Sequence, residues 1–281
     1  MSGKARSTAG EHGPAIAEGL LTALSWVTII PIKGAEAFDR TTGRRAMTAL
    51  PATGIAFGFV GAAAYGLSLL PANWNHIPHS AGFPPTALVA GVLVVTAWAL
   101  LSRFMHLDGL ADVGDALGSY AKPAKAQEIL ADKYTGAFGV AAVALTLLAQ
   151  VLAVATLAWR FEASTVYMIL LFTPIAARTA AQIACTDLFR PQKDEGFGAM
   201  TIGTLRPLTP ALWLVVIVLL SLTEVMRGMS LAFPLAMIAA VLVAVPWCRY
   251  LSRRFDGLNG DCIGATIELS TALIVLIAAL G

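Results

Sequence analysis

The sequence is short of charge and of cysteine. Only 13% of its 281 residues are charged, about half of the ~25% found in an average soluble domain. A soluble protein of this length needs a charged surface, so a soluble domain is excluded. Three cysteines are too few to staple such a chain, which excludes a disulfide-rich secreted scaffold. A net charge of +2 without a basic stripe argues against a nucleic-acid partner.

Apolar residues are in excess instead, at 57% of the chain with a mean hydropathy of +0.74, which also excludes intrinsic disorder. A membrane-spanning helix needs about 20 mostly apolar residues. Gly54, Gly58 and Gly61 in the first such stretch indicate close helix packing. We predict an all-α, polytopic integral membrane helical bundle in a lipid bilayer, with about seven transmembrane helices at 47–70, 85–102, 137–158, 164–184, 208–225, 230–247 and 263–280.

The beginning of the chain differs from these spans. Segment 15–32 is apolar but contains Glu18 and ends at Pro31, which favours an N-terminal interfacial helix over a span. Residues 1–14 are expected to form a flexible tail. The whole chain is then a single integral membrane domain.

The connections between the spans alternate in basic content. Loops 33–46, 103–136 and 185–207 and the connection after the sixth span are rich in Lys and Arg, and the others are poor. Because basic loops stay on the cytoplasmic side, the rich set is predicted to be cytoplasmic and the C-terminus external. The same loops carry nearly all the acidic residues, so the chemistry is expected at the cytoplasmic face.

Three acidic residues follow the second span. Asp108, Asp112 and Asp115 are spaced i, i+4 and i+7, which stacks their carboxylates on one helical face, where they repel one another. Protonation, a basic residue from elsewhere or a divalent cation could neutralise them. Within 104–121 the only basic side chain is His106. Mg²⁺ prefers such hard oxygen ligands, and the pattern is typical of a phosphoryl-transfer site.

Further acidic residues extend this pattern. Asp132 is a candidate further metal ligand, and Lys133 a candidate phosphate contact. Asp261 and Glu268 are seven residues apart and can share a helical face. Glu268 lies inside an apolar run, where a carboxylate is costly and usually functional.

Other polar residues allow more than one interpretation each. Arg178 in the fourth span should face the bundle interior or extend toward the cytoplasm, either paired with an acid or bound to an anionic ligand. His106 is a base, a residue that orients another catalytic group, or a simple interfacial residue. Loop 190–206 has the glycines and basic residues of a phosphate-facing loop. The three cysteines match no metal-binding spacing.

The segment His-Leu-Asp-Gly-Leu-Ala-Asp-x-x-Asp at 106–115 resembles the signature of the cobalamin synthase family, also called adenosylcobinamide-GDP ribazoletransferase. The resemblance runs from about residue 18 to the C-terminus. Lys133-Tyr134 stands where the family often has Ser-Arg, and Phe197 replaces a usual Leu. Other matches follow in the same order: Arg45, Pro51 and Gly54, Glu128 to Asp132, Gly136 and Gly139, Arg178, Glu195 to Gly198, and Gly260 to Glu268.

The resemblance implies a bacterial inner-membrane enzyme with an Mg²⁺ cofactor. Its small-molecule substrates would be adenosylcobinamide-GDP and α-ribazole or its 5′-phosphate, and its products adenosylcobalamin or its phosphate and GMP. The base would be His106 or Glu268, which stays open. Metal ligands would be Asp108, Asp112, Asp115, Asp132 and Asp261, and substrate contacts Arg178, Lys133, Lys193, Gly136 and Gly198.

Two other functions fit parts of the pattern. A CDP-alcohol phosphotransferase also uses Mg²⁺ and an Asp-Gly motif, but Ala111-Asp112 stands where Ala-Arg is expected. A secondary transporter would carry charges near mid-bilayer and paired broken spans, whereas these acidic residues gather at one face. The sequence leaves homo-oligomer formation open.

Overall fold

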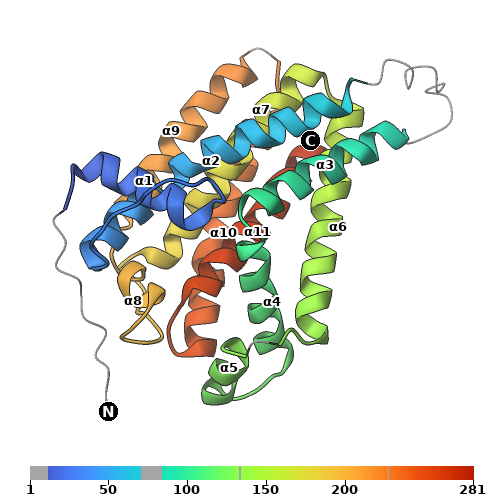
Figure 1. Cartoon of the computed structure of the whole chain (residues 1–281). Coiled ribbons are helices and arrows are strands. Elements are labelled where there is room, and N and C mark those ends of the chain that lie inside the picture. Colours follow the sequence, from blue (N-terminus) through green and yellow to red (C-terminus); the bar gives the residue numbers. More distant parts are fainter. Residues whose placement is uncertain (1–11, 71–83, 133, 227) are drawn as a thin grey trace.

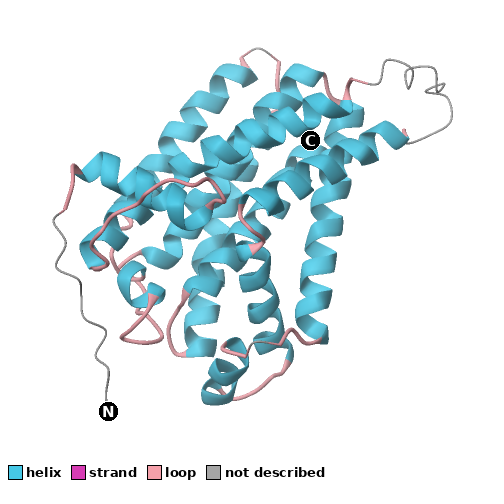
Figure 2. Cartoon of the chain, viewed as in Figure 1, coloured by secondary structure: helices cyan, strands magenta, loops and turns pink. Residues whose placement is uncertain are grey.

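The computed structural model describes residues 12–70, 84–132, 134–226 and 228–281. Within these ranges the chain is helical, with two isolated β-bridges, Thr186 with Leu205 and Pro191 with Leu258, and no strand (Figure 2). The helices pack side by side as a bundle (Figure 1). This confirms the predicted all-α membrane bundle.

Six described helices are long and apolar enough to cross a membrane, or up to seven counting one bent pair. Several of these helices are longer than the predicted spans. Helix α2 begins seven residues before the predicted span, and α10 continues through Arg249, Arg253 and Arg254, which were expected in a loop. The helices are α2 (Arg40–Ser68), α6 (Ala137–Arg160), α7 (Ala163–Ala181, continued by the 3₁₀ turn η3, Gln182–Cys185), α9 (Leu208–Val225), α10 (Ala232–Phe255) and α11 (Gly260–Leu280).

The predicted span at 85–102 is the first arm of the bent pair. Helix α3 (Pro85–Leu101) turns by 91° into α4 (Met105–Gly118). The turn is made by Arg103 and Phe104, both with positive φ, at 55° and 60°. This left-handed conformation is uncommon for side-chain-bearing residues. It separates the apolar α3 from the acidic α4.

Helix α1 (Ala15–Val27) has 13 residues, too few to cross a bilayer. It packs on α2 through Gly19, where a Cβ would lie 2.6 Å from the carbonyl oxygen of Arg45. Glu18 on its buried face accepts hydrogen bonds from Arg45 (3.0 Å) and from the Gly13 N–H (2.6 Å). His12, the first described residue, also lies 3.1 Å from Glu18. Residues 1–11 of the predicted flexible tail lie outside the described residues.

Helix α7 lies at the centre of the bundle. The span Ala163–Cys185 is 83% buried, whereas α9 is 17% buried and exposes its apolar side chains as a lipid-facing helix would. A Cβ on Gly54 would lie 2.6 Å from the Cα of Ile175, and one on Gly58 would lie 2.7 Å from the carbonyl oxygen of Leu171. The prediction that these glycines allow close helix packing is therefore confirmed.

Two short helices lie in the basic-rich connections, α5 (Pro123–Leu130) and α8 (Phe197–Thr201). Both lie at the end of the bundle opposite the C-terminus (Figure 1). This arrangement agrees with the alternation of basic-rich and basic-poor connections.

Candidate active site

Helix α4 carries the three predicted acidic residues on its less buried face. Leu107, Leu110 and Val113 on its other positions are buried against the bundle. Asp108 is exposed, and Asp112 and Asp115 are half-buried. The i, i+4, i+7 spacing therefore does present three carboxylates on one helical face.

Asp112 lies at the centre of a larger acidic cluster. The carboxylates of Asp108, Asp115, Asp132 and Asp261 all lie close enough to act electrostatically on Asp112. They come from α4, from the segment after α5 and from the first turn of α11. The structure thus brings together all five predicted metal ligands, and we call them the acidic cluster.

Close packing of α4 on α11 brings two parts of this cluster together. A Cβ on Gly109 would lie 2.9 Å from both the Cα and the carbonyl oxygen of Asp261. Asn259 caps α11 by accepting from the Cys262 N–H (3.2 Å), and its side-chain amide donates to Asp261 (2.6 Å). The Asp261 carboxylate is therefore held at the start of α11, facing α4.

Asp115 differs from the other acidic residues because its carboxylate accepts two backbone hydrogen bonds. Gly136 N–H donates at 2.6 Å and Gly139 N–H at 2.8 Å. These are the free amides of the first turn of α6, where the helix dipole also favours a negative charge. These bonds stabilise the Asp115 carboxylate, and Gly136, a predicted substrate contact, directs its N–H to Asp115.

The donor set suits a hard cation, although its side chains do not converge as they stand. Among the described residues, no three His, Cys, Asp or Glu side chains are close enough to hold a metal ion. Carboxylates that repel one another separate when no cation lies between them. Asp132 accepts a hydrogen bond from the Tyr134 N–H at 3.2 Å, and Asp261 accepts one from the Asn259 amide at 2.6 Å. The carboxylate oxygens of Asp108, Asp112, Asp132 and Asp261 are of the type that Mg²⁺ prefers.

Two of the residues predicted to bind substrate, Lys193 and Gly198, lie near the start of α11. Lys193 is exposed and close enough to Asp261 to act on it electrostatically. Gly198 lies beside Asn259, with a Cβ position 3.3 Å from the Asn259 Cα. Lys133 lies outside the described residues. The loop that carries Lys193 is held to the α10–α11 turn, since Gln192 N–H donates to the Leu258 carbonyl at 2.8 Å.

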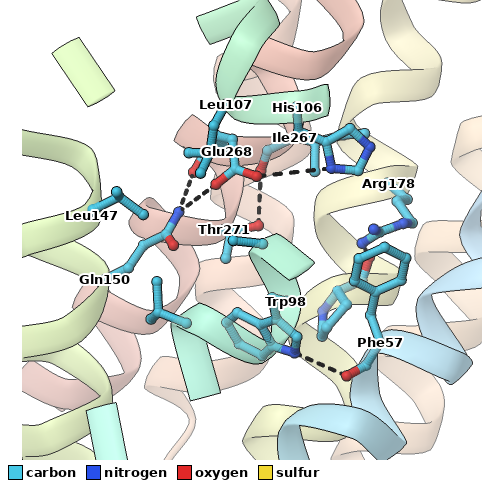
Figure 3. A pocket seen from close by; sticks show the side chains of 13 residues that line it. Phe57, Trp98, His106, Leu107, Leu147, Gln150, Arg178, Ile267, Glu268 and Thr271 are labelled. Atoms are coloured by element: carbon cyan, nitrogen blue, oxygen red, sulfur yellow. Dashed lines mark hydrogen bonds and ion pairs between the residues drawn. The ribbon is translucent and has the colours of Figure 1, made fainter. Parts of the chain in front are cut away.

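A second group of polar residues is buried between the helices of the bundle (Figure 3). His106 Nδ1 lies 3.8 Å from Glu268 Oε1, and Gln150 Nε2 donates to Glu268 Oε2 at 2.9 Å. Arg178, 2% exposed, is close enough to Glu268 to act electrostatically, and its guanidinium carbon lies 3.6 Å from the centre of the Phe57 ring. We call His106, Gln150, Arg178 and Glu268 the buried network.

The cavity inside the buried network is small. Its volume of about 20 Å³ has room for about one water molecule and none for a pyrophosphate. Arg178 donates to the Pro174 carbonyl of its own helix at 3.1 Å. The structure therefore places Arg178 beside an acid, one of the two arrangements considered from the sequence, and its role as a phosphate contact stays a prediction.

The sequence analysis missed Gln150 and Phe57. Gln150 is 1% exposed, in the middle of α6, and an amide within an apolar span is a signal that could have found it. Phe57 carries no such signal, because nothing in an apolar run distinguishes a ring that faces a cation from one that faces lipid.

The chain is similar to proteins of one kind over nearly its whole length. A family described as cobalamin-5-phosphate synthase matches residues 19–279. Proteins named adenosylcobinamide-GDP ribazoletransferase from Corynebacterium efficiens and Corynebacterium diphtheriae are 44% and 41% identical, over 99% and 100% of this chain and 97% and 98% of theirs. One from Frankia casuarinae is 34% identical over 92% of this chain and 93% of its own. No solved structure matches the chain.

The acidic helix α4 packs against the first turn of α11, and the family match covers residues 19–279. The chain belongs to the cobalamin-5-phosphate synthase family.

Proposed function

We propose that the protein transfers the adenosylcobinamide phosphate of adenosylcobinamide-GDP to a hydroxyl of α-ribazole or of its 5′-phosphate, with release of GMP. The names of its relatives support this reaction. The observation that carries it is the acidic cluster, in which four carboxylates from three segments of the chain act on Asp112. Such a set is costly to keep unless it holds a cation beside an anionic substrate.

The reaction exchanges a phosphoanhydride bond for a phosphodiester bond. The ribazole hydroxyl oxygen forms a bond to the phosphorus nearer the cobinamide, and the bond from that phosphorus to the oxygen of GMP breaks. The hydroxyl proton leaves to a base. The main demand on the protein is to position the pyrophosphate and to stabilise negative charge on the leaving oxygen.

Four members of the acidic cluster would hold Mg²⁺: Asp108, Asp112, Asp132 and Asp261. When bound, Mg²⁺ supplies positive charge that neutralises the pyrophosphate oxygens. Asp115 would support this set from behind, because its two hydrogen bonds to α6 fix the end of α4. Lys193 would contact the phosphate from the loop side, since it already lies near Asp261.

The position of His106 favours it over Glu268 as the base. His106 lines a large pocket together with Asp108 and Asp261, whereas Glu268 lines only the water-sized cavity behind it. With Nδ1 toward Glu268, the His106 Nε2 is the atom left to receive the proton. Glu268 is then a positioning residue that orients the imidazole.

Release of GMP tests this function directly. Purified protein in detergent is incubated with adenosylcobinamide-GDP, α-ribazole 5′-phosphate and Mg²⁺, with and without excess EDTA. We expect GMP in an amount equal to the corrinoid product. We expect no GMP when EDTA is present or when the ribazole is left out. GMP release that does not depend on ribazole would indicate a hydrolase and would overturn the proposal.

We further propose that the site faces the cytoplasm from the bacterial inner membrane. The basic-rich connections support this orientation, and the acidic cluster lies at their end of the bundle. Adenosylcobinamide-GDP is charged and does not cross a bilayer unaided. Inside-out vesicles should release GMP at once, and right-side-out vesicles only after permeabilisation. The reverse order would refute this orientation.

A further inference from the structure

A pocket of about 400 Å³ lies beside the acidic cluster, between α1, α2, α4 and α11. This volume is within the range of roughly 300–1,000 Å³ that is usual for small-molecule sites. It is far larger than the cavity of the buried network, and it is the one that Asp108 and Asp261 line. The catalytic carboxylates therefore border a space that can take part of a substrate.

The walls of this pocket are mostly apolar and come from helices distant in sequence. Trp26 of α1, Met47 and Leu50 of α2, Phe197 of α8 and Ile263 of α11 contribute side chains to it. The carboxylates that line it come from α4 and α11. A ligand with a flat apolar part and a hydroxyl-bearing part would match this division.

Two aromatic rings are placed to contact a flat ligand. The rings of Trp26 and Phe197 lie edge to face, with centres 5.2 Å apart and planes at 71°. Trp26 is half-buried and Phe197 is 37% exposed, so each side chain keeps surface that a ligand can contact. Stacking of a base on an aromatic side chain contributes about 1–3 kcal/mol per base in proteins that bind single-stranded nucleic acid.

His106 provides a polar group to the same pocket. It is 4% exposed, and its Nε2 has no hydrogen-bond partner among the described residues. A buried nitrogen without a partner is costly. A hydroxyl of a bound ligand would supply that partner.

We propose that this pocket binds the aromatic base of α-ribazole, with the ribose directed toward Asp108, Asp261 and His106. This inference rests on the proposed function, and it assigns one of the two substrates to one place. Dimethylbenzimidazole has hydrocarbon edges that suit apolar walls. Guanine would have to place the donors and acceptors of its edge against Ser25, Arg103 and the two carboxylates that also line the pocket, and the test below distinguishes it from the ribazole base. The corrin macrocycle is too large for the space.

The test compares two phenylalanines that both contact Trp26. Phe197 lines the pocket, whereas Phe38 stacks on Trp26 from outside it, with ring centres 6.4 Å apart. Phe197→Ala should raise the KM for α-ribazole 5′-phosphate by roughly tenfold and leave the KM for adenosylcobinamide-GDP unchanged. Phe38→Ala, the matched control, should change neither.

A second measurement uses the unmodified protein. Free dimethylbenzimidazole should inhibit GMP release competitively against α-ribazole 5′-phosphate, and not competitively against adenosylcobinamide-GDP. Phe197→Ala should weaken this inhibition by a similar factor. Both measurements require that the unmodified protein release GMP, so its inactivity would overturn the proposed function itself.

A wrong pocket assignment would give a result different from that of an inactive protein. If the protein is active and Phe197→Ala raises the KM for adenosylcobinamide-GDP instead, the pocket holds the guanine nucleotide and the assignment is wrong. Unchanged KM values for both substrates, or inhibition by dimethylbenzimidazole that competes with the corrinoid, would overturn it equally.

Discussion

The side-chain amide of Gln150 in α6 donates a hydrogen bond of 2.9 Å to the Glu268 carboxylate in α11. The same amide lies 3.2 Å from the Glu268 backbone carbonyl. One side chain therefore ties α6 to α11 at the residue that faces His106. The buried network connects the interior of the bundle to the start of α4, two residues before Asp108.

Removing this amide should loosen the bundle and lower activity together. Gln150→Leu leaves one Glu268 oxygen without its donor, which should cost about 1–2 kcal/mol of stability. Turnover should also fall, because Glu268 no longer fixes the His106 ring. Thermal unfolding in detergent and GMP release measure the two effects. Thr156→Val is the control, because Thr156 is a half-buried residue of α6 whose hydroxyl donates to the Leu152 carbonyl of its own helix. Equal losses in both variants would contradict this role for Gln150.

Asp112 should matter for chemistry and little for folding. Asp112→Asn removes the charge at the centre of the acidic cluster and keeps the side chain's shape, so kcat should fall by roughly a hundredfold or more. Membrane insertion and thermal stability should stay as they are, or stability should rise, because four nearby carboxylates no longer repel it.

The matched control for Asp112 is Asp187→Asn, an exposed acid on the same end of the protein. It should retain full turnover. Near-normal activity of Asp112→Asn would remove this residue from the site, and equal loss in Asp187→Asn would attribute the effect to surface charge.

The sequence predicted contacts between residues that are close along the chain, and it missed several contacts between residues that are distant along the chain. The carboxylates of α4 follow from a spacing within eight residues, and the helix that carries them could be predicted with them. Asp115 was predicted as a metal ligand from the same spacing, whereas its hydrogen bonds to two amides that lie 21 and 24 residues further on could not be predicted. Gln150 and Glu268 are separated by 118 residues, so only the packing of α6 on α11 shows that they meet.

The helix limits show the same contrast between local sequence signals and distant contacts. Hydropathy predicted the span of α9 at its observed limits, because a lipid-facing helix is apolar all round. It placed the end of α10 eight residues early, since Arg249, Arg253 and Arg254 are helical without being apolar. The turn at Arg103 and Phe104 has no glycine to mark its positive φ values, so the 91° bend could not be predicted.

Asp115 should behave unlike the other members of the acidic cluster. Asp115→Ala leaves the Gly136 and Gly139 amides of α6 without an acceptor, and we expect a loss of about 1–2 kcal/mol, as for a helix N-cap. Asp115→Asn keeps one acceptor oxygen and should recover part of that loss. Thermal unfolding of the two variants beside Asp112→Asn measures this difference. Equal stability of Asp115→Ala and the unmodified protein would show that the carboxylate does not cap α6.

Gly109 should be required for the distance between Asp108 and Asp261. In Gly109→Ala the new methyl group would lie 2.9 Å from the backbone of Asp261, closer than van der Waals contact allows, so α4 and α11 must separate. Overpacking of this kind costs about 1–3 kcal/mol, and the separation should also weaken the response of activity to Mg²⁺. Gly66→Ala serves as the control, since its methyl group would meet only the Tyr167 hydroxyl, at 3.1 Å, at the movable end of a side chain. GMP release is titrated with Mg²⁺. The half-saturating Mg²⁺ concentration should rise for Gly109→Ala and stay unchanged for Gly66→Ala. If the two curves coincide, the contact of α4 with α11 does not set the geometry of the acidic cluster.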